Sequence, residues 1–217
     1  MDSVRSIIKW AGGKKRALAS IKKHLPTGAK RLIEPFVGGG AVFLNLDFEE
    51  YLLVDINKDL INLFNIIKNS PDTFINHAEV LFCPGNNNSH YYNKVRSDFN
   101  ETDNEYYRSL LFLYLNRHGY NGLCRYNQSG GYNVPFGNND KVYFPKDELK
   151  YFNDRAKTAT FIQGDFELAF NQAKQGDVIY CDPPYSPLSN TANFTEYSGN
   201  TFTAHDHIRL VRCAEQV

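Results

Sequence analysis

Val178-Ile179-Tyr180-Cys181-Asp182-Pro183-Pro184-Tyr185 is the segment from which the rest of the chain can be placed. Its first residues are small or apolar and predict a buried strand, and the acid, prolines and tyrosine predict an abrupt end to that strand. Proline has no backbone N–H and fixes φ, so we expect a stiff turn after Asp182 whose carbonyls are free to accept hydrogen bonds. At the carboxyl end of a parallel strand, such a turn offers acceptors and an aromatic ring to one planar group.

A planar amine such as the exocyclic amine of adenine suits this turn. Its lone pair is delocalised into the ring, and acceptors on both of its hydrogens would pull the nitrogen towards a tetrahedral, nucleophilic shape. The candidate catalytic residues are therefore Asp182, Pro183, Pro184 and Tyr185. Taken alone, the tetrapeptide also fits a strand that ends in a proline-rich turn and has only a structural role. The rest of the sequence is needed to choose between the two interpretations.

The composition is that of a globular chain without a bulk charge. With 217 residues, 42% hydrophobic and 14% aromatic, the chain can form one large domain or a domain with an insertion. The formal net charge is zero, so only the distribution of charge can point to nucleic acid. Residues 1–31 are rich in Lys and Arg, and residues 106–139 contain no Asp or Glu. Both regions are candidates to face phosphate, although a solvated helix face and chance are the alternatives.

The cysteines indicate a reducing compartment. Cys83, Cys124, Cys181 and Cys213 are scattered, without the Cys-x-x-Cys spacing of a zinc or redox site, and we expect buried free thiols. The amino terminus lacks the pattern of a signal peptide, and no apolar run approaches the length of a membrane span. We therefore expect a cytoplasmic protein that contacts no membrane.

A glycine-containing stretch near the amino terminus is the first candidate ligand loop. Residues 6–14 run from a short apolar segment into a glycine turn that carries Trp10 and Lys14. Glycine lets backbone approach a ligand closely, Lys14 brings charge and Trp10 a flat wall. A helix-entry turn with a core tryptophan explains these residues equally well. A helix is expected to follow at residues 16–25.

Residues 31–55 give a stronger signal for a nucleotide-like ligand. A short strand leads into Gly38-Gly39-Gly40 and is predicted to continue directly into an apolar helix, and a second strand at residues 51–55 ends in Asp55, an acid suited to ribose hydroxyls. The third glycine of G-x-G-x-x-G is missing, so NAD fits poorly, and no G-K-[ST] follows, which excludes a P-loop. A ribosylated ligand without phosphate remains.

The strand–helix alternation is interrupted after residue 70 for too long to be a loop. We therefore predict an inserted, mostly helical lobe at residues 71–157 between two parts of a sheet domain, residues 1–70 and 158–217. Residues 107–115 predict a buried helix, and residues 127–131 predict a hairpin turn that leads to residues 132–137. Residues 116–127 combine glycine, aromatics, amides and arginine, which suits duplex DNA. A rigid loop packed by its own tyrosines is the alternative.

The alternation resumes at a third strand, residues 160–166, whose Asp165 and Phe166 could accept from an adenine amine and stack on its ring. Beyond residues 178–185, Thr203 with Asp206 predicts a capping box for a final helix. His205 and His207 are expected to be first-turn residues of that helix rather than metal ligands. In an earlier predicted helix, capped by Asn57, an apolar stripe is expected to be core: Leu60, Ile61, Phe64 and Ile67.

Four motifs in one order, at residues 9–14, 34–40, 114–127 and 182–185, closely resemble the Dam family of DNA adenine-N6 methyltransferases, which methylate adenine in GATC. The resemblance covers nearly the whole chain. It implies an α/β fold, with a Rossmann-like methyltransferase sheet and an inserted, mostly helical DNA-recognition lobe that contains the hairpin. It also implies S-adenosyl-L-methionine as methyl donor, no metal, and a target adenine flipped out of duplex DNA by a monomeric enzyme.

The resemblance assigns roles to individual positions. The positions expected to bind the donor are Trp10, Ala11, Gly12, Lys14, Glu34, Pro35, Phe36, Gly38, Gly40, Asp55, Asp165, Phe166 and Asp182. The positions expected to contact DNA are Lys9, Tyr120, Asn121, Leu123, Arg125, Asn127 and Pro135. Among these, Arg125 would contact a guanine and Tyr120 would fill the base stack.

One departure from the family pattern concerns the carboxyl terminus. Family members continue beyond the helix that ends here near Val217 and supply further strands, whereas four parallel strands are evident here, marked by Leu32, Leu52, Phe161 and Ile179. We therefore expect a truncated methyltransferase whose Asp182 strand lies on an open apolar edge. Methylation of RNA or of a protein amide, and a domain that binds donor or DNA without catalysis, stay open. So does the choice between a role in DNA repair and replication and a role in a phage or restriction system.

Overall fold

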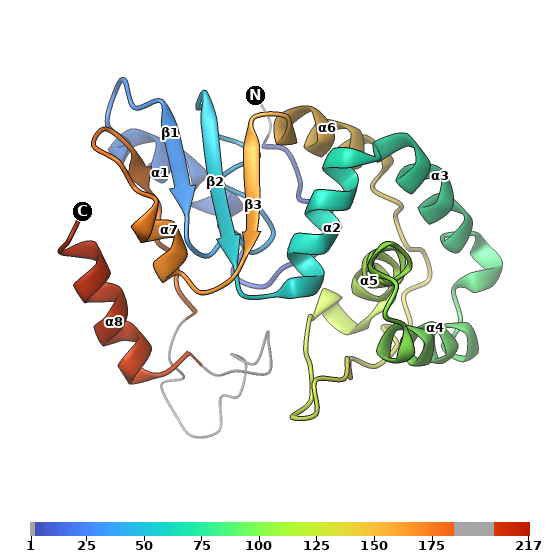
Figure 1. The fold of residues 1–217 in the computed structure, drawn as a ribbon. Coiled ribbons are helices and arrows are strands. Elements are labelled where there is room, and N and C mark those ends of the chain that lie inside the picture. Colours follow the sequence, from blue (N-terminus) through green and yellow to red (C-terminus); the bar gives the residue numbers. More distant parts are fainter. Residues whose placement is uncertain (1–2, 185–201) are drawn as a thin grey trace.

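Parallel strands form one sheet in the computed structural model, which describes residues 3–184 and 202–217 (Figure 1). Within these residues the strands are β1 (Arg31–Glu34), β2 (Glu50–Asp55), β3 (Ala159–Gln163) and β4 (Val178–Ile179). Their order across the sheet is β3-β2-β1-β4, and each neighbouring pair is parallel. This confirms the predicted α/β class and the four predicted strands.

Two strands are shorter than predicted. β3 ends at Gln163, so Asp165 and Phe166 lie in the turn that follows it, and β4 contains only Val178 and Ile179. The Tyr180 N–H still donates to the Ile33 carbonyl at 2.9 Å and extends the contact with β1. Among the described residues, β4 lies at one end of the sheet and pairs with β1 alone, as expected.

Each face of the sheet is covered by different helices because side chains alternate along a strand. Leu32 and Leu53 belong to the large apolar core, which is shared with α2 (Lys58–Asn69) and α6 (Lys146–Ala156). Ile33 and Val54 point to the other face, where a small cluster includes Ala169 of α7 (Glu167–Asn171). Next to α7 lies α8 (Ala204–Ala214), and α1 is Leu18–His24, within the predicted helix (Figure 1).

The helix predicted directly after the glycine loop is wrong. Residues 41–45 form turns, and no helix is assigned there. Backbone acceptors that a helix would use are taken by side chains instead: Arg155 donates to the carbonyls of Phe43 and Leu46, and Asn45 donates to the Ala41 carbonyl at 2.9 Å. The two contacts from Arg155 come from a distant segment, so a local pattern could not indicate them.

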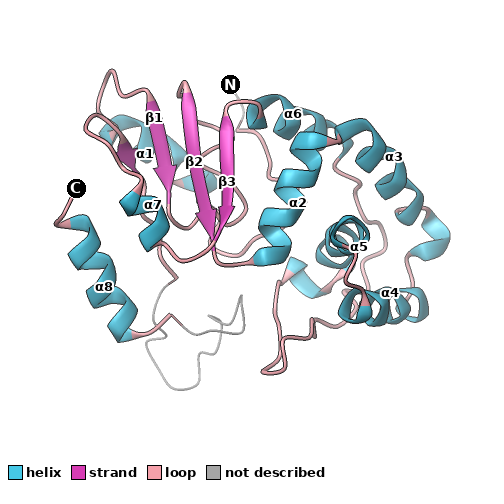
Figure 2. Cartoon of the chain, in the orientation of Figure 1, coloured by secondary structure: helices cyan, strands magenta, loops and turns pink. Residues whose placement is uncertain are grey.

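The segment that interrupts the alternation is mostly helical, with α3 (Pro71–Leu81), α4 (Ser89–Glu101) and α5 (Glu105–His118) beyond α2 as seen from the sheet (Figure 2). α5 is buried from Ser109 to His118, as its apolar sequence predicts. The Asn57 side chain caps α2 by accepting from the Leu60 N–H at 3.0 Å. The predicted stripe on α2 is core, with Leu60, Ile61, Phe64 and Ile67 all buried.

The recognition segment, defined here as residues 119–137, forms the predicted hairpin, but in a minimal form. Isolated antiparallel bridges join Gly119 to Phe136 and Tyr126 to Tyr132, and a short 3-10 turn, η3, spans Tyr120–Gly122. The hairpin reverses at Asn127, whose side-chain oxygen accepts from the N–H groups of Ser129 and Gly131 at 3.1 and 2.8 Å. Backbone hydrogen bonds also join the two arms, from the Tyr120 N–H to the Pro135 carbonyl and from the Asn133 N–H to the Arg125 carbonyl.

The cysteines only partly match the expectation of buried thiols. All are free and Cys124 is buried, but Cys83 and Cys181 are exposed and Cys213 is intermediate. Cys83 follows the end of α3, and Cys181 follows the end of β4, where the backbone leaves the packed layers. Over residues 3–184 and 202–217, none of the helices has the length and apolarity that crossing a bilayer requires.

Candidate active site

The carboxyl ends of the parallel strands gather most of the predicted donor-binding and catalytic residues. Glu34 ends β1, Asp55 ends β2, and residues 182–184 follow β4 without regular secondary structure. The strand ends and the recognition segment lie on the same side of the molecule, at the bottom of Figure 1. Of the predicted catalytic residues, Asp182, Pro183 and Pro184 are half-buried there, and Tyr185 lies outside the described residues.

Asp55 links the glycine loop, residues 38–40, to the end of β2 through a hydrogen bond. Its two carboxylate oxygens accept from the N–H groups of Gly38, at 2.9 Å, and Asn57, at 3.0 Å. Burial raises the pKa of Asp55, and these backbone hydrogen bonds act in the opposite direction. Gly38 and Gly40 have φ of +48° and +70°, which residues with a Cβ rarely adopt.

Trp10 brings the amino-terminal motif against this loop. A Cβ built on Gly38 would lie 2.7 Å from Nε1 of Trp10, and one built on Gly39 would lie 2.9 Å from the Cβ of Trp10. The indole therefore packs directly on the glycine backbone, with no room for a side chain between them. Pro35 is buried at the start of the same loop.

Lys14 joins the amino-terminal motif to the proline turn. Its ammonium forms an ion pair with the Asp182 carboxylate, and it also donates to the Gly12 carbonyl at 2.9 Å. The side chains of Lys14 and Asp182 are 19% and 21% exposed, so the pair is accessible to a bound molecule. Ala11 and Gly12, on the same turn, are exposed.

Glu34 is a buried acid beside this pair. One of its oxygens, Oε1, has no hydrogen-bond partner among the described residues. Burial, with a smaller contribution from the charge of Asp182 and against a hydrogen bond from the Phe43 backbone, raises the pKa of Glu34 to about 8. The site therefore contains an acid that can either carry a proton or face a cation at physiological pH.

An aromatic wall, formed by the rings of Phe36, Phe166 and Phe202, lies next to the end of β3. The ring centroids of Phe36 and Phe166 are 5.4 Å apart, and Phe202 lies 5.6 Å from Phe36. Arg209 of α8 donates to Asp165 at 2.9 Å, and its guanidinium lies 4.8 Å from the centroid of Phe166. The structure thus brings Asp165 and Phe166 together with Phe202 and Arg209, two residues that sequence reasoning missed.

The start of α8 matches its prediction. Thr203 and Asp206 form the capping box, and His205 and His207 lie in the first turn of the helix. No cluster of His, Cys, Asp and Glu suited to hold a metal is found in the described part of the chain.

The predicted DNA contacts lie on the recognition segment, with one exception. Tyr120 is 51% exposed, and its N–H donates to the Pro135 carbonyl at 2.9 Å. Arg125 is exposed, and its Nε donates to the Asn133 side chain at 2.7 Å. The remaining positions on this segment are exposed or half-buried: Asn121, Leu123, Asn127 and Pro135. The exception is Lys9, which comes from the amino-terminal motif.

Asn116 places Lys9 beside the recognition segment. The Asn116 side chain accepts from the Lys9 N–H at 2.8 Å and donates to the carbonyls of Lys9, at 2.8 Å, and Gly122, at 3.1 Å. Lys9 Nζ reaches the Arg117 carbonyl at 3.5 Å, and the pKa of Lys9 is lowered by burial and then by Arg117. In the sequence, the one indication that Asn116 has such a role is that it is a single amide at the end of the apolar run of α5.

Comparison with known proteins agrees with this geometry. A family model described as D12 class N6 adenine-specific DNA methyltransferase matches residues 10–217. The chain is 52% identical over 216 residues to a DNA adenine methylase of Vibrio cholerae, covering 100% of this chain and 78% of that protein. It is 50% identical over 217 residues to that of Serratia marcescens, covering 100% and 80%, and 49% identical over 215 residues to that of Escherichia coli K12, covering 99% and 77%. The chain therefore belongs to the D12 class of N6 adenine-specific DNA methyltransferases.

Proposed function

We propose that this methyltransferase uses S-adenosyl-L-methionine to methylate N6 of an adenine that is flipped out of duplex DNA containing GATC. The observation that carries the proposal is the meeting of three segments at the carboxyl ends of the strands: the turn at Asp182, the glycine loop with Asp55, and the amino-terminal motif with Trp10 and Lys14. Open α/β sheets bind their ligands at this edge.

The proposed chemistry belongs to Asp182 and the turn after it. The Asp182 carboxylate and the Pro183 carbonyl accept the two hydrogens of the adenine amine, which frees the nitrogen lone pair for attack, and Tyr185 stacks on the base. The donor supplies a methyl group on a sulfonium sulfur. As the N–C bond forms and the S–C bond breaks, positive charge develops on N6 beside the Asp182 carboxylate, which stabilises it. The proton then leaves N6 to solvent, with Asp182 as its first acceptor.

The residues at the strand ends fit the donor. Asp55 faces the ribose hydroxyls, and the aromatic wall with Asp165 suits the donor adenine. Glu34, with a buried oxygen that no described residue satisfies, faces the cationic part of the donor. We propose the same role, contact with the donor, for the remaining positions: Trp10, Ala11, Gly12, Lys14, Pro35, Phe36, Gly38 and Gly40.

We further propose that residues 71–157 act as a target-recognition lobe on a sheet domain of residues 1–70 and 158–217, in a monomer. Tyr120 fills the space left by the flipped base, Arg125 contacts a guanine in the major groove, and Lys9 approaches from the sheet side. The surrounding contacts come from Asn121, Leu123, Asn127 and Pro135. The exposure of Tyr120 and Arg125 supports these roles.

Transfer of a labelled methyl group tests the function directly. The chain is given labelled S-adenosyl-L-methionine with a GATC duplex, the same duplex with its adenine replaced, an RNA of the same sequence, or an unrelated protein. We expect label only in the GATC duplex. Label in RNA or protein would show that the substrate belongs to that class instead of duplex DNA. Label in both duplexes would contradict the proposed GATC specificity. Donor binding without label in any acceptor would favour a non-catalytic binding domain.

A further inference from the structure

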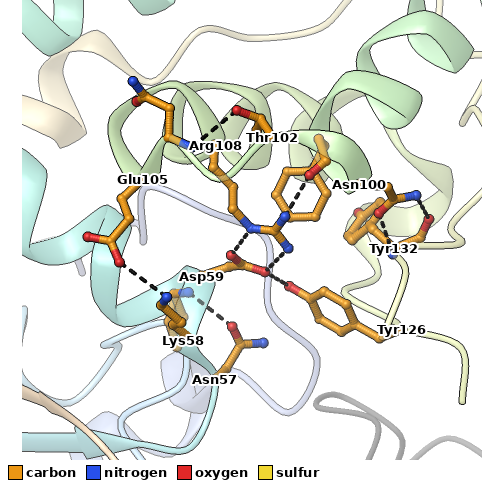
Figure 3. Close-up of polar contacts among 12 residues, drawn as sticks. Asn57, Lys58, Asp59, Asn100, Thr102, Glu105, Arg108, Tyr126 and Tyr132 are labelled. Atoms are coloured by element: carbon orange, nitrogen blue, oxygen red, sulfur yellow. Dashed lines mark hydrogen bonds and ion pairs between the residues drawn. The ribbon is translucent and has the colours of Figure 1, made fainter. Parts of the chain in front are cut away.

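A buried carboxylate outside the strand ends connects the sheet to the recognition segment (Figure 3). Asp59 lies in the first turn of α2 and is 7% exposed. It accepts from Nε and Nη2 of Arg108 at 2.5 and 3.0 Å, and from the hydroxyl of Tyr126 at 2.7 Å. The pairing with Arg108 is bidentate, which fixes the geometry of both groups.

Arg108 extends this contact to α4. Its Nη1 donates to the Phe99 carbonyl at 2.6 Å, and its guanidinium lies 3.9 Å from the centroid of the Phe99 ring. A buried charge pair is stable only when its remaining donors and acceptors are satisfied. Here Tyr126 and the Phe99 carbonyl satisfy them, so loss of the Tyr126 hydroxyl leaves the carboxylate with one donor fewer.

Tyr126 is part of the recognition segment, between Arg125 and Asn127. It forms the bridge to Tyr132, and the two ring centroids are 5.7 Å apart. Tyr132 is held in turn by Asn100 of α4, which accepts from its N–H at 2.8 Å and donates to its carbonyl at 3.2 Å. Each arm of the hairpin is thus attached to a different helix, one through Asp59 and the other through Asn100.

The short segment that contains Asp59 also contributes to the proposed donor site. Asp55 ends β2, the Asn57 N–H donates to Asp55, and the Asn57 side chain caps α2 just ahead of Asp59. Residues 55–59 therefore carry the proposed ribose-binding carboxylate at one end and the anchor of the recognition segment at the other. A shift of the hairpin relative to Asp59 is a shift relative to the donor.

We propose that Asp59, Arg108 and Tyr126 form a positioning network that holds the recognition segment in register with the donor site and thereby determines how strictly the enzyme discriminates between DNA sequences. Asp59 and Tyr126 are both buried, so the network acts through the position of the recognition segment. This inference rests on the proposed function, since discrimination requires a specific target. Loosening the network should reduce the advantage of the correct duplex over altered ones and leave donor binding intact.

Tyr126→Phe is the test variant, because it removes one hydroxyl, keeps the ring against Tyr132 and leaves the Asp59–Arg108 pair in place. Tyr107→Phe is the matched control: its hydroxyl also contacts a carboxylate, Asp98 at 3.4 Å, but on the exposed surface outside the network. The affinity of each protein is measured by fluorescence anisotropy for the GATC duplex and for duplexes with one base pair of the site replaced. Donor affinity is measured by calorimetry.

We expect the ratio of affinities for GATC over altered duplexes to fall about fivefold to tenfold in Tyr126→Phe, the effect of about one hydrogen bond. Donor affinity should stay within about twofold, and Tyr107→Phe should match the original chain. Arg108→Lys, which keeps the charge but loses the bidentate contact, should shift the ratio in the same direction.

Two results would overturn the inference while the proposed function stands: an unchanged ratio in Tyr126→Phe, or an equal loss of affinity for every duplex and for the donor, which is the mark of a purely structural role. If the original chain itself fails to prefer the GATC duplex, the proposed specificity is wrong, and the inference is wrong with it.

Discussion

Gly122 lies against Lys9 so closely that a Cβ built on Gly122 would be 2.3 Å from the Cβ of Lys9. The two residues come from the recognition segment and the amino-terminal motif, and Asn116 hydrogen-bonds the backbone of both. The absence of a side chain at Gly122 is therefore what allows a proposed DNA contact from the sheet side to meet those on the hairpin.

Gly122→Ala should destabilise the protein by about 3 kcal/mol, because the new methyl group adds a clash with Lys9 to the strain of a positive φ. The φ of Gly122 is +64°. Gly130→Ala is a control, since Gly130 has a φ of +80° with nothing within 4 Å of its built Cβ, and it should cost about 1 kcal/mol. Urea unfolding measures both, and equal losses would contradict the contact with Lys9.

Asn116→Ala should lower the free energy of unfolding by about 3 kcal/mol, because it leaves three backbone groups of Lys9 and Gly122 without their partner. Affinity for DNA should fall more than affinity for the donor, since Lys9 loses its position. Asn171→Ala, at an exposed position ending α7, is the control and should change stability by less than about 0.5 kcal/mol. A mild effect at Asn116, similar to that at Asn171, would show that other contacts hold Lys9.

Asp182→Asn should reduce the rate of methyl transfer about 100-fold or more, because the charge that stabilises the developing positive nitrogen is lost. DNA affinity should change little, since Asp182 is proposed to contact the reacting amine and not the phosphates. Single-turnover kinetics and anisotropy measure the two quantities. Asp72→Asn on the exposed surface of α3 is the control. Retention of transfer in Asp182→Asn would remove this residue from the chemistry.

The stability of the protein should fall as the pH rises through the range in which Glu34 is protonated only in the folded state. Burial raises the pKa of Glu34 from its ordinary 4.5 to about 8, so folding holds a proton that the unfolded chain releases. The contribution lost between these pH values is about 5 kcal/mol. Glu34→Gln, which cannot ionise, should have a flatter dependence of unfolding free energy on pH over the same range, and an unchanged slope would show that Glu34 ionises normally.

Donor binding should release a proton from Glu34. A cation placed beside this acid stabilises its ionised form, so donor affinity should increase with pH until about 8, the pKa of the free site. Calorimetry in two buffers of different ionisation enthalpy counts the protons released. Glu34→Gln should abolish the release. Proton uptake instead of release would mean that the donor presents no cation to Glu34.

Local patterns in the sequence determined much of the secondary structure of this protein. The apolar runs predicted the described strands, and in β1 and β2 the reason is that parallel strands buried on both faces need continuous apolar sequence. The Asn57 cap and the box at Thr203 were predictable because such hydrogen bonds close within one turn. That the strand ends ahead of Asp182 was predictable because the prolines after it lack the N–H that a longer ladder needs.

Tertiary structure decided what depends on residues far apart in the chain. Arg155 donates to the carbonyls of Phe43 and Leu46 after the glycine loop, Arg209 pairs with Asp165, and Asn116 reaches Lys9 across 107 positions of sequence. The anchoring of Tyr126 by Asp59 belongs to the same group. These are single polar contacts whose partners are chosen by packing, and a hydrogen bond between two buried side chains leaves no periodicity in a sequence. The sequence therefore determined which chemical groups the site contains, and only the fold decided which residues hold them in place.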